Sequence, residues 1–143
     1  MKPNERHNAR ASAIQALYQW QISETPLAEL EHQFLTNEIR KKTDLDYFKE
    51  LVRGSIQKYA ELDEKFTPFL NRSLEELDPI ELACLRIATY ELIYRLEIPY
   101  RVVINEALEL TKKFGSIEGY KFVNGVLDKL AHQLRSIEIN AKK

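Results

Sequence analysis

Apolar side chains recur at helical spacing along most of the chain, and no long stretch alternates apolar with polar residues. A spacing of three or four residues places side chains on one face of an α-helix. The first segment of this kind is expected to end near Gln21, and its buried seam is expected to hold Ala9, Ala13, Ala16, Leu17 and Trp20. The pattern therefore predicts an all-α fold that begins with a helix whose opposite face is polar.

Caps and charged pairs divide the rest of the first half. Thr25 and Pro26 are typical of a helix start, and an apolar stripe continues to Leu35 before the lysine pair at residues 41–42 interrupts it. A third helix, which Asp44 can cap, is expected to bury Phe48, Leu51, Val52, Ile56 and Tyr59. A short fourth helix is predicted through Leu62, Phe66 and Phe69.

The second half repeats the same start signal at Asp78 and Pro79. Residues 80–96 are apolar on nearly every side, which is expected of a helix enclosed by other helices. Pro99 ends this segment, because the residue before a proline is disfavoured in the α conformation. The next predicted helix, over residues 102–114, ends in two lysines and a glycine, a common C-terminal signature.

A short connection over residues 116–119 precedes the last predicted helix. Its buried face is expected to hold Phe122, Val123, Val126, Leu127, Leu130 and Leu134. In all, the pattern predicts about seven helices in one domain, residues 1–143, with two packed lobes over approximately residues 1–72 and 73–143.

Two poor helix formers, Asn124 and Gly125, stand in the middle of that last helix. A glycine there costs about 1 kcal/mol relative to alanine. We interpret Gly125 as a place where a neighbouring helix approaches closely, and we expect Asn124 and Asn105 to be buried amides that hold loop and helix geometry.

Composition limits the chemistry that the chain can perform. The 143 residues are 44% hydrophobic and 30% charged, which fits one globular domain. The single cysteine, Cys84, excludes a disulfide framework and is expected in the core, in a reducing, cytoplasmic protein. His7, His32 and His132 are isolated and expected at the surface, so the sequence predicts no catalytic site, metal site or cofactor. No apolar run is long enough to span a membrane, and no signal-like segment follows the N-terminus.

Charge is divided unequally along the chain despite a net charge of −1. Residues 1–20 carry three basic side chains against one acid, whereas residues 61–81 carry seven acids against two bases. Lys2, Arg6 and Arg10 recur every four residues and would form one stripe on a helix, with Tyr18 further along the same line. Such a stripe is either a solvated helix start or a surface for single-stranded RNA, in which cations neutralise phosphates and an aromatic ring stacks on a base.

A second candidate for RNA binding opens the last helix. Lys121 and Phe122 stand at a helix start, where free backbone N–H groups favour an anion. The alternative is that Phe122 belongs to the core and Lys121 is merely solvated.

Four segments resemble the NusB family of transcription antitermination factors. They are AIQALYQW (13–20), LRIATYEL (85–92), VINEALELTKKFG (103–115) and KFVNGVLDKL (121–130). The similarity covers essentially the whole chain in the family's order. It implies an all-helical fold of two three-helix bundles and binding, without catalysis, to boxA RNA together with the ribosomal protein NusE. It further implies action with other Nus factors and RNA polymerase, chiefly in ribosomal RNA operons.

The resemblance also implies which residues bind each partner. The implied RNA surface consists of Lys2, Arg6, Arg10, Glu118, Lys121 and Phe122. The implied surface for the ribosomal protein consists of Tyr18, Glu75 and Glu81. We expect the two basic helix starts to share one exposed ledge and the acidic segment to face a different neighbour.

One departure from the family pattern concerns RNA affinity. Family members commonly carry an almost unbroken arginine run near the N-terminus, whereas residues 4–10 here read NERHNAR. We therefore expect weak RNA binding by the protein alone. Two alternatives remain: the RNA-holding appendage of a cytosine methyltransferase, which the length of 143 residues disfavours, and a helical scaffold that binds only protein.

Overall fold

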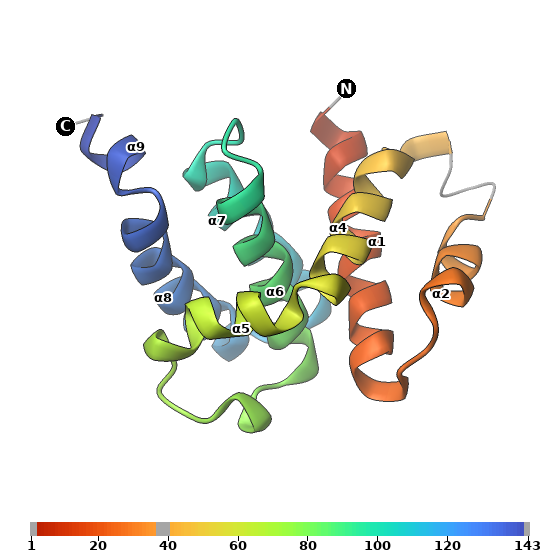
Figure 1. Ribbon diagram of the computed structural model, residues 1–143, viewed down its shortest axis with the longest axis horizontal. Coiled ribbons are helices and arrows are strands. Elements are labelled where there is room, and N and C mark those ends of the chain that lie inside the picture. Colours follow the sequence, from red (N-terminus) through yellow and green to blue (C-terminus); the bar gives the residue numbers. More distant parts are fainter. Residues whose placement is uncertain (1–2, 37–40, 142–143) are drawn as a thin grey trace.

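The computed structural model describes residues 3–36 and 41–141, which form a bundle of helices with no strand among them (Figure 1). The α-helices are α1 (Pro3–Ser23), α2 (Leu27–Phe34), α4 (Leu45–Gln57), α5 (Tyr59–Phe66), α6 (Pro79–Tyr94), α7 (Tyr100–Phe114), α8 (Ile117–Leu134) and α9 (Ser136–Ala141). Two 3-10 turns, η1 (Thr67–Phe69) and η2 (Leu74–Glu76), lie between α5 and α6. Of these eight α-helices, seven have seven residues or more, so the prediction of an all-α fold with about seven helices is confirmed.

Side-chain caps fix several helix starts. The Asp44 carboxylate accepts the backbone N–H of Tyr47 at 3.1 Å, and Asp78 accepts the N–H of Ile80 at 2.8 Å. Both caps were predicted, and both satisfy donors that a helix end leaves open. The predicted cap at Thr25 is wrong, because α2 begins one residue after Pro26 without a side-chain cap.

Helix α6 is the centre of the molecule. Its residues 83–92 are buried without interruption, and α1, α4, α5, α7 and α8 all pack on it. Figure 1 shows α6 in green between the red α1 and the blue α8. Burial on every side explains why the sequence of this helix shows no polar face.

The helices around α6 run in defined directions. Helix α1 is antiparallel to α6, because Arg10 contacts Glu91 near the end of α6 while Gln21 Nε2 donates to the Pro79 carbonyl at its start, at 2.8 Å. Helix α8 is parallel to α6, because Gly119 lies against Glu81 near the start of α6. At the other end of α8, the Arg135 guanidinium donates to the Leu92 carbonyl at 2.9 Å. The starts of α1 and α8 therefore lie at opposite ends of α6.

The division into two lobes stays a prediction. Apolar side chains from both halves of the chain form one continuous core cluster. Helix α5 precedes the predicted boundary near residue 72, yet it packs on α6 and α8 as well as on α4. Tyr59, which was expected in the core, begins α5 and is 45% exposed, because α4 ends at Gln57 and the chain turns there. Along the described residues 3–36 and 41–141, no helix has both the length and the apolar character needed to cross a bilayer.

The packing explanation for Gly125 is wrong. A Cβ atom built at Gly125 would have no heavy atom within 4 Å, and Asn124 and Asn105 are exposed rather than buried. The glycine of α8 that does permit a close approach is Gly119, where a Cβ would lie 2.8 Å from the Glu81 carboxylate. The two poor helix formers therefore lie on the solvent face of α8, not at a helix contact.

Candidate nucleic-acid interface

A hollow of about 590 Å³ lies between α1 and the end of α7. Its described lining consists of Asn8, Ala11, Ser12, Gln15, Lys41, Lys42, Thr43 and Lys113. The three lysines are exposed, and no acidic side chain is among these residues. The Asn8 amide donates to the Lys42 carbonyl at 2.8 Å and so holds the lysine pair beside α1. Lysine, hydroxyl and amide groups together are the usual partners of nucleic-acid phosphates.

These lysines are not among the RNA-binding residues predicted from the sequence. In the sequence, the pair at residues 41–42 indicates only the end of a helix stripe, and Lys113 only a helix C-terminal charge. No pattern along the chain indicates that these three lysines meet.

The predicted basic stripe on α1 divides into different environments. Lys2 lies outside the described residues. The Arg6 side chain is 29% exposed, with Nε 3.6 Å from an Asp44 oxygen and its guanidinium carbon 4.4 Å from the centre of the Tyr47 ring. It remains accessible from solvent, although its charge is partly offset by Asp44.

Arg10, in contrast, is enclosed, with only 6% of its side chain exposed. Its Nε donates to both oxygens of Glu91 at 3.1 and 3.0 Å, and its Nη1 donates to Glu106 at 2.8 Å. Burial opposes the charge, but the two carboxylates outweigh it and raise the pKa of the Arg10 guanidinium. The Tyr47 hydroxyl also donates to Glu91, and burial followed by that carboxylate raises the Tyr47 pKa. Arg10 thus joins α1 to α6 and α7 and is not open to a phosphate.

The start of α8 presents the other predicted RNA residues. The Ser116 hydroxyl oxygen accepts the Gly119 N–H at 3.0 Å and caps the helix. Glu118 and Lys121 are exposed, whereas Phe122 is half-buried against the core. The Arg72 guanidinium lies 4.3 Å from the centre of the Phe122 ring, so a cation already covers part of this aromatic surface.

The expectation that the two helix starts share one ledge is wrong in its simple form. Arg10 is level with Glu91 and the start of α8 is level with Glu81, ten residues apart on α6, which corresponds to about 15 Å along the helix. The lysine hollow lies between these two levels. Helix α7 runs from the level of Glu91 toward the level of Glu81 and carries Lys113 near its end. Exposed lysines of the hollow therefore lie between the levels of the two starts.

Fewer carboxylates of the acidic segment, residues 61–81, are free of internal partners than the count of acids in the sequence suggests. Asp63 is buried and accepts two hydrogen bonds from Arg86, at 2.8 and 2.7 Å. Glu61 accepts the Tyr94 hydroxyl, and Glu76 accepts the backbone N–H and hydroxyl of Ser73. These three carboxylates have internal partners, which a count of acids along the chain cannot reveal.

Glu75 and Glu81, predicted to meet a protein partner, differ in burial. Glu75 is exposed, whereas Glu81 is half-buried and its Oε1 has no hydrogen-bond partner among the described residues. Burial, followed by the neighbouring Asp78, raises the pKa of Glu81. The third predicted residue, Tyr18, is half-buried near the end of α1, which abuts the start of α6. Because Glu81 also lies against Gly119, this surface adjoins the start of α8, contrary to the expectation of two separate faces.

The fold and these surfaces define the class: an all-helical binding protein with a lysine-lined hollow on one side and a partly acidic end beside it. A sequence model of the NusB family matches residues 7–132, and the chain belongs to this family. Two relatives called transcription antitermination protein NusB are those of Shewanella amazonensis, 55% identical over 91% of this chain and 97% of the relative, and Shewanella halifaxensis, 53% identical over 94% and 100%.

Solved structures agree with this assignment. T. maritima NusB superposes with a TM-score of 0.77 at 28% identity and covers 92% of both chains. A crystal structure of the antitermination factors NusB and NusE in complex with dsRNA contains a chain that matches with a TM-score of 0.76 at 27% identity, over 90% of this chain and 97% of that one.

Proposed function

We propose that this protein is a transcription antitermination factor that binds boxA-containing nascent RNA together with the ribosomal protein NusE. Its relatives bear that antitermination name, and a similar chain occurs with NusE and RNA in a crystal structure. The observation that carries the proposal for this chain is the lysine hollow between α1 and α7, which has the chemistry of a phosphate-binding groove.

The RNA path runs from Arg6 through the hollow to the start of α8. Lys41, Lys42 and Lys113 neutralise successive phosphates, and Lys121 extends the path onto α8. Glu118 is exposed one turn before Lys121 and can accept hydrogen bonds from base amino groups. Phe122 offers an aromatic edge beside Arg72, and Lys2 adds a cation at the N-terminus. Arg10 supports this surface from within rather than contacting RNA.

The ribosomal protein occupies the adjoining surface formed by Tyr18, Glu75 and Glu81. A basic partner there would supply a hydrogen-bond donor to Glu81 Oε1, which has none among the residues that the structure describes. We propose further that the protein is not an enzyme, that it is cytoplasmic, and that it acts with other Nus factors and RNA polymerase to make transcription processive, chiefly in ribosomal RNA operons.

The decisive experiment is a titration of boxA RNA with the wild type and two matched double variants. Lys42→Gln/Lys113→Gln removes two charges from the hollow, whereas Lys65→Gln/Lys129→Gln removes two exposed charges elsewhere. We expect the hollow variant alone to weaken binding and to flatten the salt slope by about 1.4, which is two single-strand phosphate contacts at ~0.7 each.

Each titration is run with the protein alone, NusE alone and both, and circular dichroism checks the fold. Tighter binding by the pair than by either component is expected. Equal losses in the two double variants would place RNA outside the hollow. No change in the NusE complex on addition of RNA would support a scaffold that binds only protein.

A further inference from the structure

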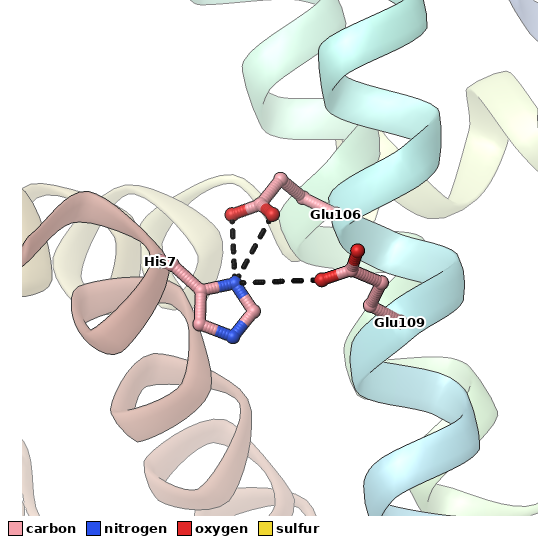
Figure 2. A group of neighbouring side chains, drawn as sticks. All are labelled: His7, Glu106 and Glu109. Atoms are coloured by element: carbon pink, nitrogen blue, oxygen red, sulfur yellow. Dashed lines mark hydrogen bonds and ion pairs between the residues drawn. The ribbon is translucent and has the colours of Figure 1, made fainter. Parts of the chain in front are cut away.

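A histidine and two glutamates meet between α1 and α7 (Figure 2). His7 Nδ1 lies 3.0 Å from both oxygens of Glu106 and 4.0 Å from Oε2 of Glu109. One ligand-type atom from each residue lies within 4.8 Å of the other two. Glu106 and Glu109 are three residues apart on α7 and therefore project from the same face, toward His7 on α1.

These separations fit coordination of one metal ion. Ligands bound at 2.0–2.2 Å in a tetrahedral arrangement are about 3.4 Å apart, close to the spacings around His7. The least constrained ligand is Glu109, whose side chain is 68% exposed and can close the remaining gap by rotating. Solvent reaches the cluster on that side, so an ion has a route in and a fourth position for water.

Charge balance also favours a divalent cation. The Arg10 guanidinium is shared by two carboxylates, with Nη2 2.9 Å from Glu91 Oε2 and Nη1 2.8 Å from Glu106 Oε1. Glu91, Glu106 and Glu109 therefore carry three negative charges against the one positive charge of Arg10, and a metal-bound imidazole is neutral, so two negative charges are left for a divalent ion. Lys113 stands one turn beyond Glu109, but it lines the lysine hollow and makes no ion pair with Glu109 among the described contacts.

Glu106 is further oriented by a second layer of contacts. Its Oε1 accepts Arg10 Nη1 at 2.8 Å, while both of its oxygens lie 3.0 Å from His7 Nδ1. Outer partners of this kind hold a ligand in one orientation and commonly set metal affinity. Only 17% of the Glu106 side chain is exposed, so this ligand is already in place before an ion arrives.

We propose that His7 Nδ1, Glu106 and Glu109 bind one divalent transition-metal ion, of the type that accepts mixed imidazole and carboxylate ligands, for which Zn²⁺ and Co²⁺ are the probes. His7 binds the ion as the neutral tautomer whose proton is on Nε2, so the ion takes the place of the His7–Glu106 hydrogen bond and links the first turns of α1 to α7. This site does not depend on RNA binding and is tested without RNA.

The experiment uses untagged, chelator-treated full-length protein titrated with Co²⁺, whose visible absorption reports coordination, followed by displacement with Zn²⁺. We expect saturation at one ion per chain. His7→Gln and Glu109→Gln should each lower the affinity at least ~10-fold, the minimum loss typical even for an outer partner of a metal site.

Matched controls separate this site from adventitious binding. His132 lies 3.9 Å from Asp128, with both side chains exposed, so His132→Gln removes a histidine–carboxylate pair for which residues 3–36 and 41–141 offer no third ligand. Glu64→Gln removes an exposed carboxylate on α5. Both controls should retain wild-type Co²⁺ affinity. Absence of saturable binding in the wild type, or binding that survives both His7→Gln and Glu109→Gln in folded protein, would overturn the proposal and leave a hydrogen-bonded pair that joins two helices.

Discussion

The Arg10 guanidinium donates through Nε to both oxygens of Glu91 in the interior of the protein. The two residues are 81 positions apart, and their pairing fastens the start of α1 to the end of α6. Removing one member of a buried ion pair leaves the other charge without a partner, which is far more costly than losing an exposed pair.

Arg10→Ala should therefore lower the free energy of unfolding by about 3–5 kcal/mol. The control is Arg53→Ala, because Arg53 is half-exposed and pairs with Glu31 at 2.9 Å on the surface. That change should cost far less, because solvent screens an exposed ion pair. Urea denaturation of both variants measures the two losses. Losses of equal size would show that the buried Arg10 pair contributes no more to stability than an exposed pair does.

Gly125→Ala should raise the free energy of unfolding by about 1 kcal/mol, because alanine is the better helix former and its Cβ meets open space. Gly119→Ala should have the opposite effect, since its Cβ would lie 2.8 Å from Glu81 Oε2. Thermal and urea unfolding measure both. Destabilisation by Gly125→Ala would mean that the exposed face of α8 is packed.

The stability of the free protein should depend on pH through Glu81. Burial, with Asp78, raises its pKa above the ordinary value of 4.5, so the folded state holds the proton more tightly than the unfolded chain does. The protonated carboxyl contributes stability below the unfolded pKa, and that contribution is lost as the pH rises through the raised folded pKa. Relative to Glu81→Gln, which cannot ionise, the wild type should lose stability from about pH 4.5 upward. Parallel urea curves across that range would contradict the prediction.

Glu81→Lys should weaken binding of the ribosomal protein by like-charge repulsion while the helical circular dichroism signal is retained. Glu64→Lys is the control, because Glu64 is exposed on α5 and lies outside the proposed surface. A pull-down or titration calorimetry compares the two. Unchanged binding by a folded Glu81→Lys variant would remove Glu81 from the partner surface.

RNA binding by the protein alone should show a modest salt dependence. Three or four phosphate contacts on a single strand give a slope of log K against log salt of roughly −2 to −3. The described cations that fit these contacts are Arg6, Lys41, Lys42 and Lys113. Anisotropy titrations at several salt concentrations measure the slope, and a flat line would be incompatible with phosphate binding.

Local signals in the sequence predicted most of the fold. The caps at Asp44 and Asp78 depend on residues within one turn. The burial of α6 on every side follows from the apolar residues of that helix itself. The site was harder to predict because it depends on helix directions. Nothing near Arg10 in the sequence indicates that Glu91 and Glu106 will enclose it. The one available signal is Glu91 itself, because an acidic residue inside a helix as apolar as α6 indicates a buried partner. The lysine hollow likewise joins segments about 30 and 100 residues apart.

The contact of Glu81 with Gly119 has a thermodynamic consequence. A cation that reaches Glu81 cancels a negative charge beside the turn that carries Lys121, and so makes that turn more attractive to a phosphate. If the two proposed surfaces bind their ligands, we expect occupancy of one to raise affinity at the other, and reciprocity requires that the gain be the same in both directions. Such a protein binds each ligand most tightly when the other is present. This cooperativity requires no movement of the backbone.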